Sequence, residues 1–277
     1  YIRSREAIRM LDQKKAASAF AELHRDFLIL PNVWDAASAK VVEHVGARAV
    51  ATSSAAVAWA HGYCDGHDLP ISKLIATIAE IARVVDLPIT CDAEGGYADA
   101  PADVAENVRA LIGAGAVGIN LEDGHTPYAS HLRKIEAVRE AAEAEGVDLY
   151  INARTDVYLK NLAPPGKALE EVVLRGQACR EAGASGLFAP FLSKPEEIAV
   201  LVAAVALPLN LMAWPGLPNA AALKALGVKR LSAATWVFRA ATHALAGAAR
   251  GFLIDGDSDA LALCAGERID FDALMKG

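Results

Sequence analysis

The chain has 277 residues, with 27 basic and 34 acidic side chains for a formal net charge of −7, and 54% of its residues are hydrophobic. This length and apolar content predict a large buried core and argue against a disordered or fibrous chain. Because there is neither a run of 18 apolar residues nor a basic excess, we expect no membrane span and no nucleic-acid partner.

Short apolar runs alternate with amphipathic helical patterns along the chain. After an expected helix at 5–24, the apolar runs lie at 27–30, 47–52, 88–91, 117–121, 149–152, 186–189, 207–212 and 229–231. Most of these runs are continuously apolar, which is typical of strands buried on both faces. Helical patterns lie between and after them, at 36–45, 72–84, 102–114, 131–145, 169–181, 195–204, 219–226 and 234–251.

Eight strand–helix repeats predict a (β/α)8 TIM barrel, which we expect to form one domain over residues 1–277. Its parts would be an N-terminal helix over 1–25, the barrel over 26–233 and C-terminal helices over 234–277. An open doubly wound sheet is the alternative, disfavoured because no glycine-rich phosphate loop follows the first strand. Asp35 and Ser130 are expected N-caps. Expected helix stops are Gly46, Gly115, Gly183 and Gly227.

Charged residues follow several of the expected strands. The strand ends read Thr-Ser-Ser at 52–54, Asp-Ala-Glu-Gly-Gly-Tyr at 92–97, Glu-Asp at 122–123 and Arg-Thr-Asp at 154–156. In a barrel these ends meet at the active-site face, where neighbouring carboxylates repel one another unless a cation lies between them. Oxygen ligands suit Mg²⁺ or Mn²⁺.

Asp92 and Glu94 are two residues apart, so on a strand both carboxylates would enter the barrel mouth. The alternative is that they cap the next helix or pair with a lysine. The guanidinium fork of Arg154 suits a substrate carboxylate, and it could also form a salt bridge to Glu122 or Asp156.

Ser53 and Ser54 could hold a carboxylate or oxyanion with their hydroxyl and N–H groups, although a Ser-Ser pair is also ordinary loop chemistry.

Together, these motifs resemble the isocitrate lyase / phosphoenolpyruvate mutase superfamily over about residues 30–216. The residues that carry the resemblance are Leu-Pro-Asn-Val-Trp-Asp-Ala-Ala-Ser-Ala at 30–39, Gly-Ile-Asn-Leu-Glu-Asp at 118–123, Ala-Arg-Thr-Asp at 153–156, and the segments at 52–54 and 92–97. The resemblance implies a TIM barrel whose last helix is exchanged between subunits, usually in a homotetramer. It also implies Mg²⁺ and a small 2-oxo or 2-hydroxy carboxylate substrate.

The resemblance also assigns roles to individual residues. Asp92 matches the direct metal ligand. Asp65, Glu94 and Glu122 match the carboxylates that hold the water molecules of the metal. Ser53, with the backbone amides of Ser54 and Ala55, matches the cradle for the substrate carboxylate, and Arg154 matches its charged partner. We expect Arg154, Ser53 and Glu122 to take part in catalysis.

The chain departs from the family after the fourth expected strand. The segment 122–131 contains neither the cysteine of the C–C lyases nor the gating loop of the mutases, and Pro190 stands where the mutases place a histidine. His125, Tyr128 and His131 are therefore the candidates for the acid/base. Asn210 is expected either to face the site or to serve in capping or strand pairing.

The main functional hypothesis is a Mg²⁺- or Mn²⁺-dependent C–C lyase, hydrolase or decarboxylase that forms an enolate. The alternatives are a P–C bond enzyme, such as a phosphonopyruvate hydrolase or mutase, and a barrel that binds oxo-acids without turnover. The alanine-rich segment 234–251 allows close helix packing, and we expect a dimer or tetramer. The four cysteines form no CxxC pair and no signal peptide is recognisable, so the sequence predicts a cytoplasmic protein.

Overall fold

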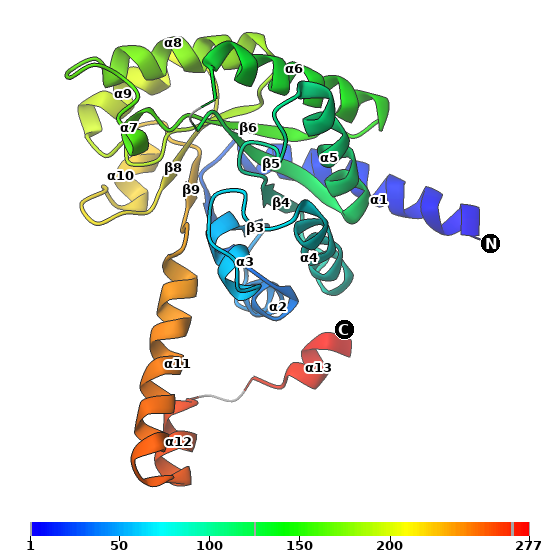
Figure 1. The fold of residues 1–277 in the computed structure, drawn as a ribbon, viewed down its shortest axis with the longest axis vertical. Helices are drawn as coiled ribbons and strands as arrows, with labels where there is room; N and C mark the ends of the chain where they lie inside the picture. The colour runs from blue at the N-terminus through cyan, green and yellow to red at the C-terminus, as the bar shows by residue number, and fades with distance from the viewer. Residues whose placement is uncertain (1, 125, 267–268, 277) are drawn as a thin grey trace.

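The computed structural model describes residues 2–124, 126–266 and 269–276. Nine parallel strands form one nearly closed sheet with helices around it, in the order β1-β9-β8-β7-β6-β5-β4-β3-β2, so the predicted TIM barrel is confirmed (Figure 1). The strands are β1 (Leu28–Leu30), β2 (Asn32–Val33), β3 (Val50–Thr52), β4 (Ile89–Asp92), β5 (Ala116–Glu122), β6 (Tyr150–Arg154), β7 (Gly186–Phe188), β8 (Leu209–Met212) and β9 (Arg230–Ser232).

The first predicted strand, at 27–30, is present as β1, and a second short strand that was not predicted, β2, follows it after Pro31. Leu30 of β1 pairs with Ser232 of β9, whereas Asn32 of β2 pairs with Ala51 of β3. Proline has no N–H to donate to a strand ladder, so it stands where the segment changes partners. This one segment therefore joins the two ends of the sheet and closes the barrel.

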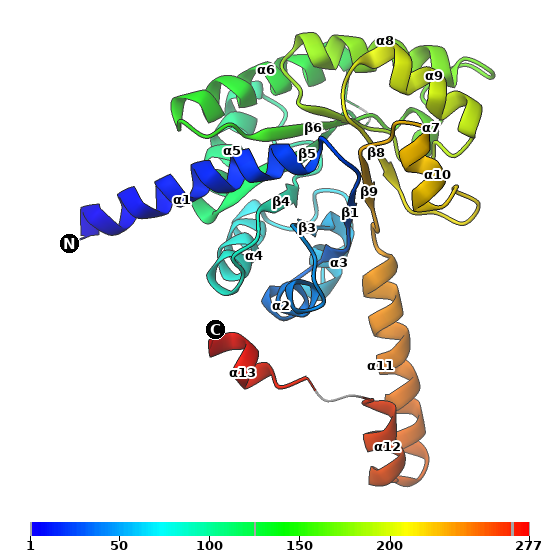
Figure 2. The same cartoon turned by 180° about the vertical axis from the view of Figure 1, so that it is seen from behind.

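Helices surround the barrel and cover the outer faces of the strands (Figures 1 and 2). Around the barrel they are α2 (Ala36–His44), α4 (Ile71–Val84), α5 (Pro101–Ala114), α6 (Tyr128–Ala144), α8 (Ala168–Glu181), α9 (Pro195–Val205) and α10 (Ala220–Ala225). In α4, for example, Leu74, Ile78 and Ile81 are fully buried, because positions three and four apart fall on one helix face. Two further helices, α3 (Ser54–Ala60) and α7 (Val157–Lys160), follow β3 and β6 and were not predicted.

The ends of the helices match most of the sequence signals. Asp35 caps α2, with its Oδ1 accepting the N–H of Ser38 at 2.7 Å. All four predicted stop glycines have a positive φ, which glycine adopts without strain. The predicted N-cap at Ser130 is wrong, because α6 begins at Tyr128 after Pro127 and places Ser130 within its first turn.

The N-terminal helix α1 (Ile2–Leu23) lies at one end of the barrel, beside β5 and β6 (Figure 2). Its Phe20 is fully buried, and a Cβ on Gly118 of β5 would lie only 2.8 Å from that ring. Gly118 therefore makes room for the aromatic side chain that closes this end of the barrel.

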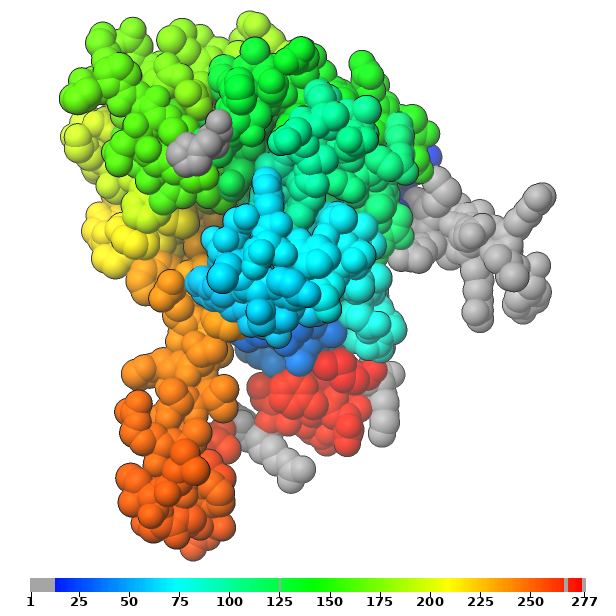
Figure 3. All heavy atoms as spheres, in the orientation of Figure 1, coloured from blue at the N-terminus to red at the C-terminus, as the bar shows by residue number. Residues whose placement is uncertain are grey.

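The chain leaves the barrel after β9 through α11 (Trp236–Asp255), which continues into α12 (Ser258–Cys264) and α13 (Phe271–Lys276). Figure 3 shows α11 and α12 extending from the barrel as an arm. Of the residues that the structure describes here, none in α11 is buried, and Leu253 and Ile254 are 83% and 78% exposed. Within the described residues, no helix is long and apolar enough to cross a membrane.

Candidate active site

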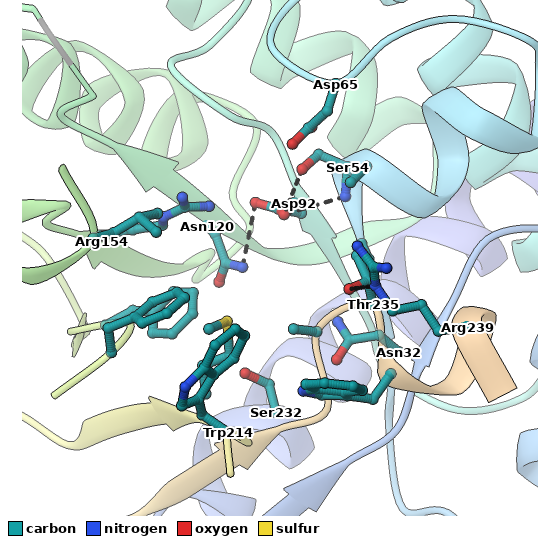
Figure 4. A pocket seen from close by; sticks show the side chains of 18 of the residues that line it. Asn32, Ser54, Asp65, Asp92, Asn120, Arg154, Trp214, Ser232, Thr235 and Arg239 are labelled. Carbon is teal, nitrogen blue, oxygen red and sulfur yellow. Dashed lines mark hydrogen bonds between the residues drawn. The ribbon is translucent and has the colours of Figure 1, made fainter. Parts of the chain in front are cut away.

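A cavity of about 330 Å³ opens at the carboxyl ends of the barrel strands (Figure 4). Six of the eight predicted site residues line it, namely Ser53, Ser54, Ala55, Asp65, Asp92 and Arg154. The other two, Glu94 and Glu122, line a neighbouring cavity of about 510 Å³. The structure thus brings the predicted residues to one face of the barrel but divides them between two adjoining spaces.

Asp92 is the last residue of β4, and its carboxylate is held from two sides. Its Oδ2 accepts hydrogen bonds from the backbone N–H and the hydroxyl of Ser54, at 3.2 and 2.9 Å, and its Oδ1 accepts from Nδ2 of Asn120 at 3.4 Å (Figure 4). The N–H of Ser54, expected in the substrate cradle, is therefore bonded to Asp92. Ser53 lines the cavity and also caps α3, with its Oγ accepting from Ala56 N at 3.5 Å.

Glu94 does not share the orientation of Asp92, because β4 ends at Asp92 and the backbone of Glu94 is left-handed, with φ at 48°. The two-residue strand spacing therefore does not apply to this pair. The Glu94 carboxylate is buried and accepts hydrogen bonds from the hydroxyl of Tyr97 at 2.7 Å and from the backbone N–H of His67 at 2.6 Å. It faces the second cavity together with Glu122.

Arg154 ends β6 and forms both of the salt bridges considered from the sequence. One guanidinium nitrogen lies 2.8 Å from Oε2 of Glu122, and its Nε donates to Oδ1 of Asp156 at 2.7 Å. The Arg154 guanidinium also lies 5.7 Å from the ring centre of Phe188. It lines the cavity on the side opposite Ser54 (Figure 4), so the fork is fixed by the protein and still faces the space for a ligand.

Negative charge accumulates around these cavities. Burial raises the pKa of Glu122 to about 7 against the opposing effect of Arg154, and Asp156 and Asp92 raise it further. Burial and the neighbouring Asp92 carboxylate raise the pKa values of Asp65 and Glu94. A cation between these groups would relieve their repulsion, and their oxygen donors suit a hard divalent ion.

The carboxylates are not already arranged around a common point. Among the described residues, no group of three or more His, Cys, Asp or Glu side chains is positioned to hold a metal.

Sequence reasoning missed a row of amides beneath the cavity. Nδ2 of Asn152 donates to Oδ1 of Asn120 at 2.8 Å, and Asn120 in turn donates to Asp92. Both asparagines are buried and face the barrel interior. The sequence does contain a sign of this row. Asn120 and Asn152 are polar residues within otherwise apolar runs, and they stand two positions before Glu122 and Arg154, respectively.

Two of the three acid/base candidates face away from the cavity. The Tyr128 hydroxyl donates to the backbone oxygen of Arg175, and the His131 side chain is 1% exposed in the packing of α6. His125 lies outside the described residues. Asn210 is buried in the barrel interior, where its Oδ1 accepts from the Ser232 hydroxyl at 3.4 Å.

Comparison with known proteins identifies the family. The family model described as phosphoenolpyruvate phosphomutase matches residues 20–253. The chain belongs to the isocitrate lyase / phosphoenolpyruvate mutase superfamily. The expectation of an enzyme of this lyase and mutase type is thereby confirmed.

Several relatives cover most of the chain. A solved structure of a candidate lyase/mutase from Burkholderia cenocepacia J2315 is 32% identical, with a TM-score of 0.86 over 96% of this chain and 98% of that one. A candidate phosphonomutase from the same organism is 40% identical, with a TM-score of 0.81 over 85% and 99% of the two chains. The 2-methylisocitrate lyase of Aeropyrum pernix is 31% identical over 67% of this chain and 61% of its own length.

Proposed function

We propose that this member of the superfamily is a magnesium-dependent lyase that breaks a carbon–carbon bond in a small 2-oxo or 2-hydroxy carboxylic acid. Hydrolytic or decarboxylating cleavage through the same enolate belongs to this proposal. The observation that carries it is the fixed Asp92 carboxylate, which shares a cavity with the guanidinium of Arg154. Relatives named 2-methylisocitrate lyase and oxaloacetate decarboxylase support the same class of reaction.

In this proposal Asp92 holds the metal directly, and Asp65, Glu94 and Glu122 hold its water molecules. The oxygen-rich donor set supports this assignment, as do the pKa values of Asp65, Glu94 and Glu122, which lie above their ordinary range. A bound Mg²⁺, or Mn²⁺ in its place, would supply positive charge to stabilise an enolate. Ser54 and Asn120 keep the Asp92 carboxylate in one orientation, so no reorganisation is needed when a ligand arrives.

The substrate carboxylate would lie between Arg154 and the Ser53–Ala55 segment, both of which line the cavity. Arg154 is held by Glu122 and Asp156, so its guanidinium stays oriented without a ligand. A group fixed in this way orients the substrate with little loss of entropy on binding.

Glu122 is the candidate for moving a proton. Burial brings its pKa to about 7, close to the value at which a carboxyl group both accepts and donates protons near neutral pH. Its bridge to Arg154 links the protonation of Glu122 to the charge at the substrate carboxylate.

We also propose that the arm formed by α11 and α12 packs against a second copy in a dimer or tetramer. Its apolar side chains Leu253, Ile254 and Leu263 are each more than three-quarters exposed, at 83%, 78% and 82%. Several large apolar side chains exposed on one arm are typical of an interface.

The proposal is tested by offering oxaloacetate, alkylmalates, methylisocitrate and phosphonopyruvate, each with Mg²⁺ and after chelation. We expect one of the carbon–carbon substrates to be cleaved only with metal present. A lyase or decarboxylase reaction would release a 2-oxo acid, and hydrolysis of oxaloacetate would release acetate and oxalate. Phosphate release from phosphonopyruvate would replace the proposal with P–C cleavage. Saturable binding without turnover of any compound would show a binding protein.

A further inference from the structure

The cavity that contains Asp92 and Arg154 has a row of aromatic side chains on its other side. Asp92 and Arg154 come from the ends of β4 and β6, whereas the other side is formed by the ends of β7 and β8, the residues that follow them, and the start of α11. The apolar residues there are Phe188, Phe191, Met212, Trp214 and Trp236, and the polar residues Ser232, Thr235 and Arg239 lie beside them.

Three of these aromatic rings form a continuous row. The ring centres of Phe191 and Trp214 are 4.3 Å apart, and those of Trp214 and Trp236 are 5.7 Å apart. Trp236 is anchored by a hydrogen bond from its indole Nε1 to the backbone oxygen of Ala213 at 2.8 Å. Phe191 has a left-handed backbone, with φ at 66°, a conformation that costs energy in a non-glycine residue and recurs at ligand sites.

These rings are only partly covered by the rest of the protein. Trp214 and Trp236 both line the cavity and are 43% and 40% exposed. Figure 4 shows Trp214 across the cavity from Asp92 and Asp65.

We propose that the aromatic row of Phe191, Trp214 and Trp236 binds an apolar substituent of the substrate, so that the enzyme acts on 2-oxo or 2-hydroxy acids with an alkyl or aryl group of several carbons. The inference rests on the proposed function for placing the carboxylate at Arg154. Burial of the substituent against the rings removes apolar surface from water on both sides, which strengthens binding by about fourfold for each methylene group added.

The test uses unreactive 2-oxo acids with side chains of increasing length: pyruvate, 2-oxobutyrate, 2-oxopentanoate and phenylpyruvate. Their dissociation constants are measured by calorimetry with Mg²⁺ present. We expect affinity to rise along the series by about fourfold per methylene, and Trp214→Ala to remove most of this gain. Trp214→Leu, which keeps an apolar side chain, should restore part of it.

Leu174→Ala is the matched control, because Leu174 is 57% exposed on α8 and lines neither cavity. It should leave the dependence on chain length unchanged. Arg154→Lys should weaken all four acids by a similar factor, since each has the same carboxylate.

Equal affinity along the series with pyruvate still bound would overturn the apolar subsite and leave the proposed function standing. Absence of binding by every acid would overturn both. A Trp214→Ala protein that changes its mass in light scattering while keeping the full chain-length gain would instead assign the aromatic row to contact with a second copy. Turnover plays no part in these measurements, so they remain decisive if none of the reactive substrates is cleaved.

Discussion

Replacing Arg154 by lysine distinguishes a role of this residue in binding substrate from a role in balancing buried negative charge. The two bridges of Arg154, at 2.8 Å to Glu122 and 2.7 Å to Asp156, use different edges of its guanidinium. A lysine ammonium keeps the charge but has no planar fork, so it cannot reproduce both bridges and face the cavity as well. In the variant, Asp156 would keep its salt bridge to Lys160, whose Nζ lies 2.9 Å from Oδ2 of Asp156. Glu122 would keep only the more distant Lys160 Nζ, at 3.7 Å from its Oε1.

The expected stability loss follows from one lost charge-assisted hydrogen bond. Such a bond contributes about 1.5–3 kcal/mol, and because Asp156 keeps a partner we expect about 2 kcal/mol. For a chain of this size the melting temperature should fall by about 4–8 °C. If Arg154 also binds the substrate carboxylate, a loss of about 2 kcal/mol in binding free energy should raise KM by about thirtyfold.

Arg175→Lys is the matched control for this experiment. Arg175 also bridges two carboxylates, Asp123 at 2.6 Å and Glu171 at 2.7 Å, and its side chain is 12% exposed against 15% for Arg154, but it lines neither cavity. Both variants should lose melting temperature to a similar extent, and only Arg154→Lys should show the large rise in KM. A kinetic defect no larger than that of Arg175→Lys would refute a role for Arg154 in binding substrate.

Three further outcomes are expected. Chelation should abolish activity. Asp92→Asn should then prevent the recovery of activity on adding Mg²⁺, and Glu94→Gln should reduce this recovery less. Full activity after chelation would contradict the metal site. Light scattering at micromolar concentration should show a dimer or tetramer that Ile254→Glu weakens, and a monomeric parent protein would contradict this. Burial lowers the pKa of His131 from 6.5 to about 4, so the unfolded chain binds more protons in that range. Unfolding free energy should therefore fall as pH decreases from 7.5 to 5, by about 2 kcal/mol from this residue, and urea titrations of His131→Phe should show a correspondingly shallower fall. An unchanged slope in that variant would mean that His131 is not held neutral by the fold.

The barrel was predictable because its strands are buried on both faces and its helices carry ordinary end signals. Each of the eight apolar runs overlaps a strand of the structure, although β2 lies outside them, and the N-cap at Asp35 and the four stop glycines were recognisable from residue type alone. The N-cap expected at Ser130 failed because α6 already begins at Tyr128, with Pro127 in the N-cap position and no side-chain cap.

The residue types of the site were predictable, but the directions in which the side chains point were less so. The carboxyl ends of parallel strands must meet, so Asp92, Glu122 and Arg154 were bound to be neighbours. Nothing in the sequence shows that β4 ends at Asp92 or that Glu94 adopts a left-handed backbone, because that conformation is fixed by contacts with His67 and Tyr97 from the surrounding loops. The Ser53–Ser54 pair, which also fits an ordinary turn, begins α3 instead.

The aromatic row lies apart from the residues proposed for chemistry, and this separation affects how substrate choice can change within this fold. The residues proposed for chemistry are coupled to one another: Arg154 is held by Glu122 and Asp156, and Asp92 by Ser54 and Asn120. A substitution there disturbs buried charges as well as the ligand, which is costly. The aromatic row, in contrast, is held by ring contacts and one backbone hydrogen bond, and no salt bridge reaches it among the residues described. Its side chains can be exchanged for larger or smaller ones without altering the charge balance at Asp92, so specificity for the substituent can vary while the bond-breaking machinery stays the same.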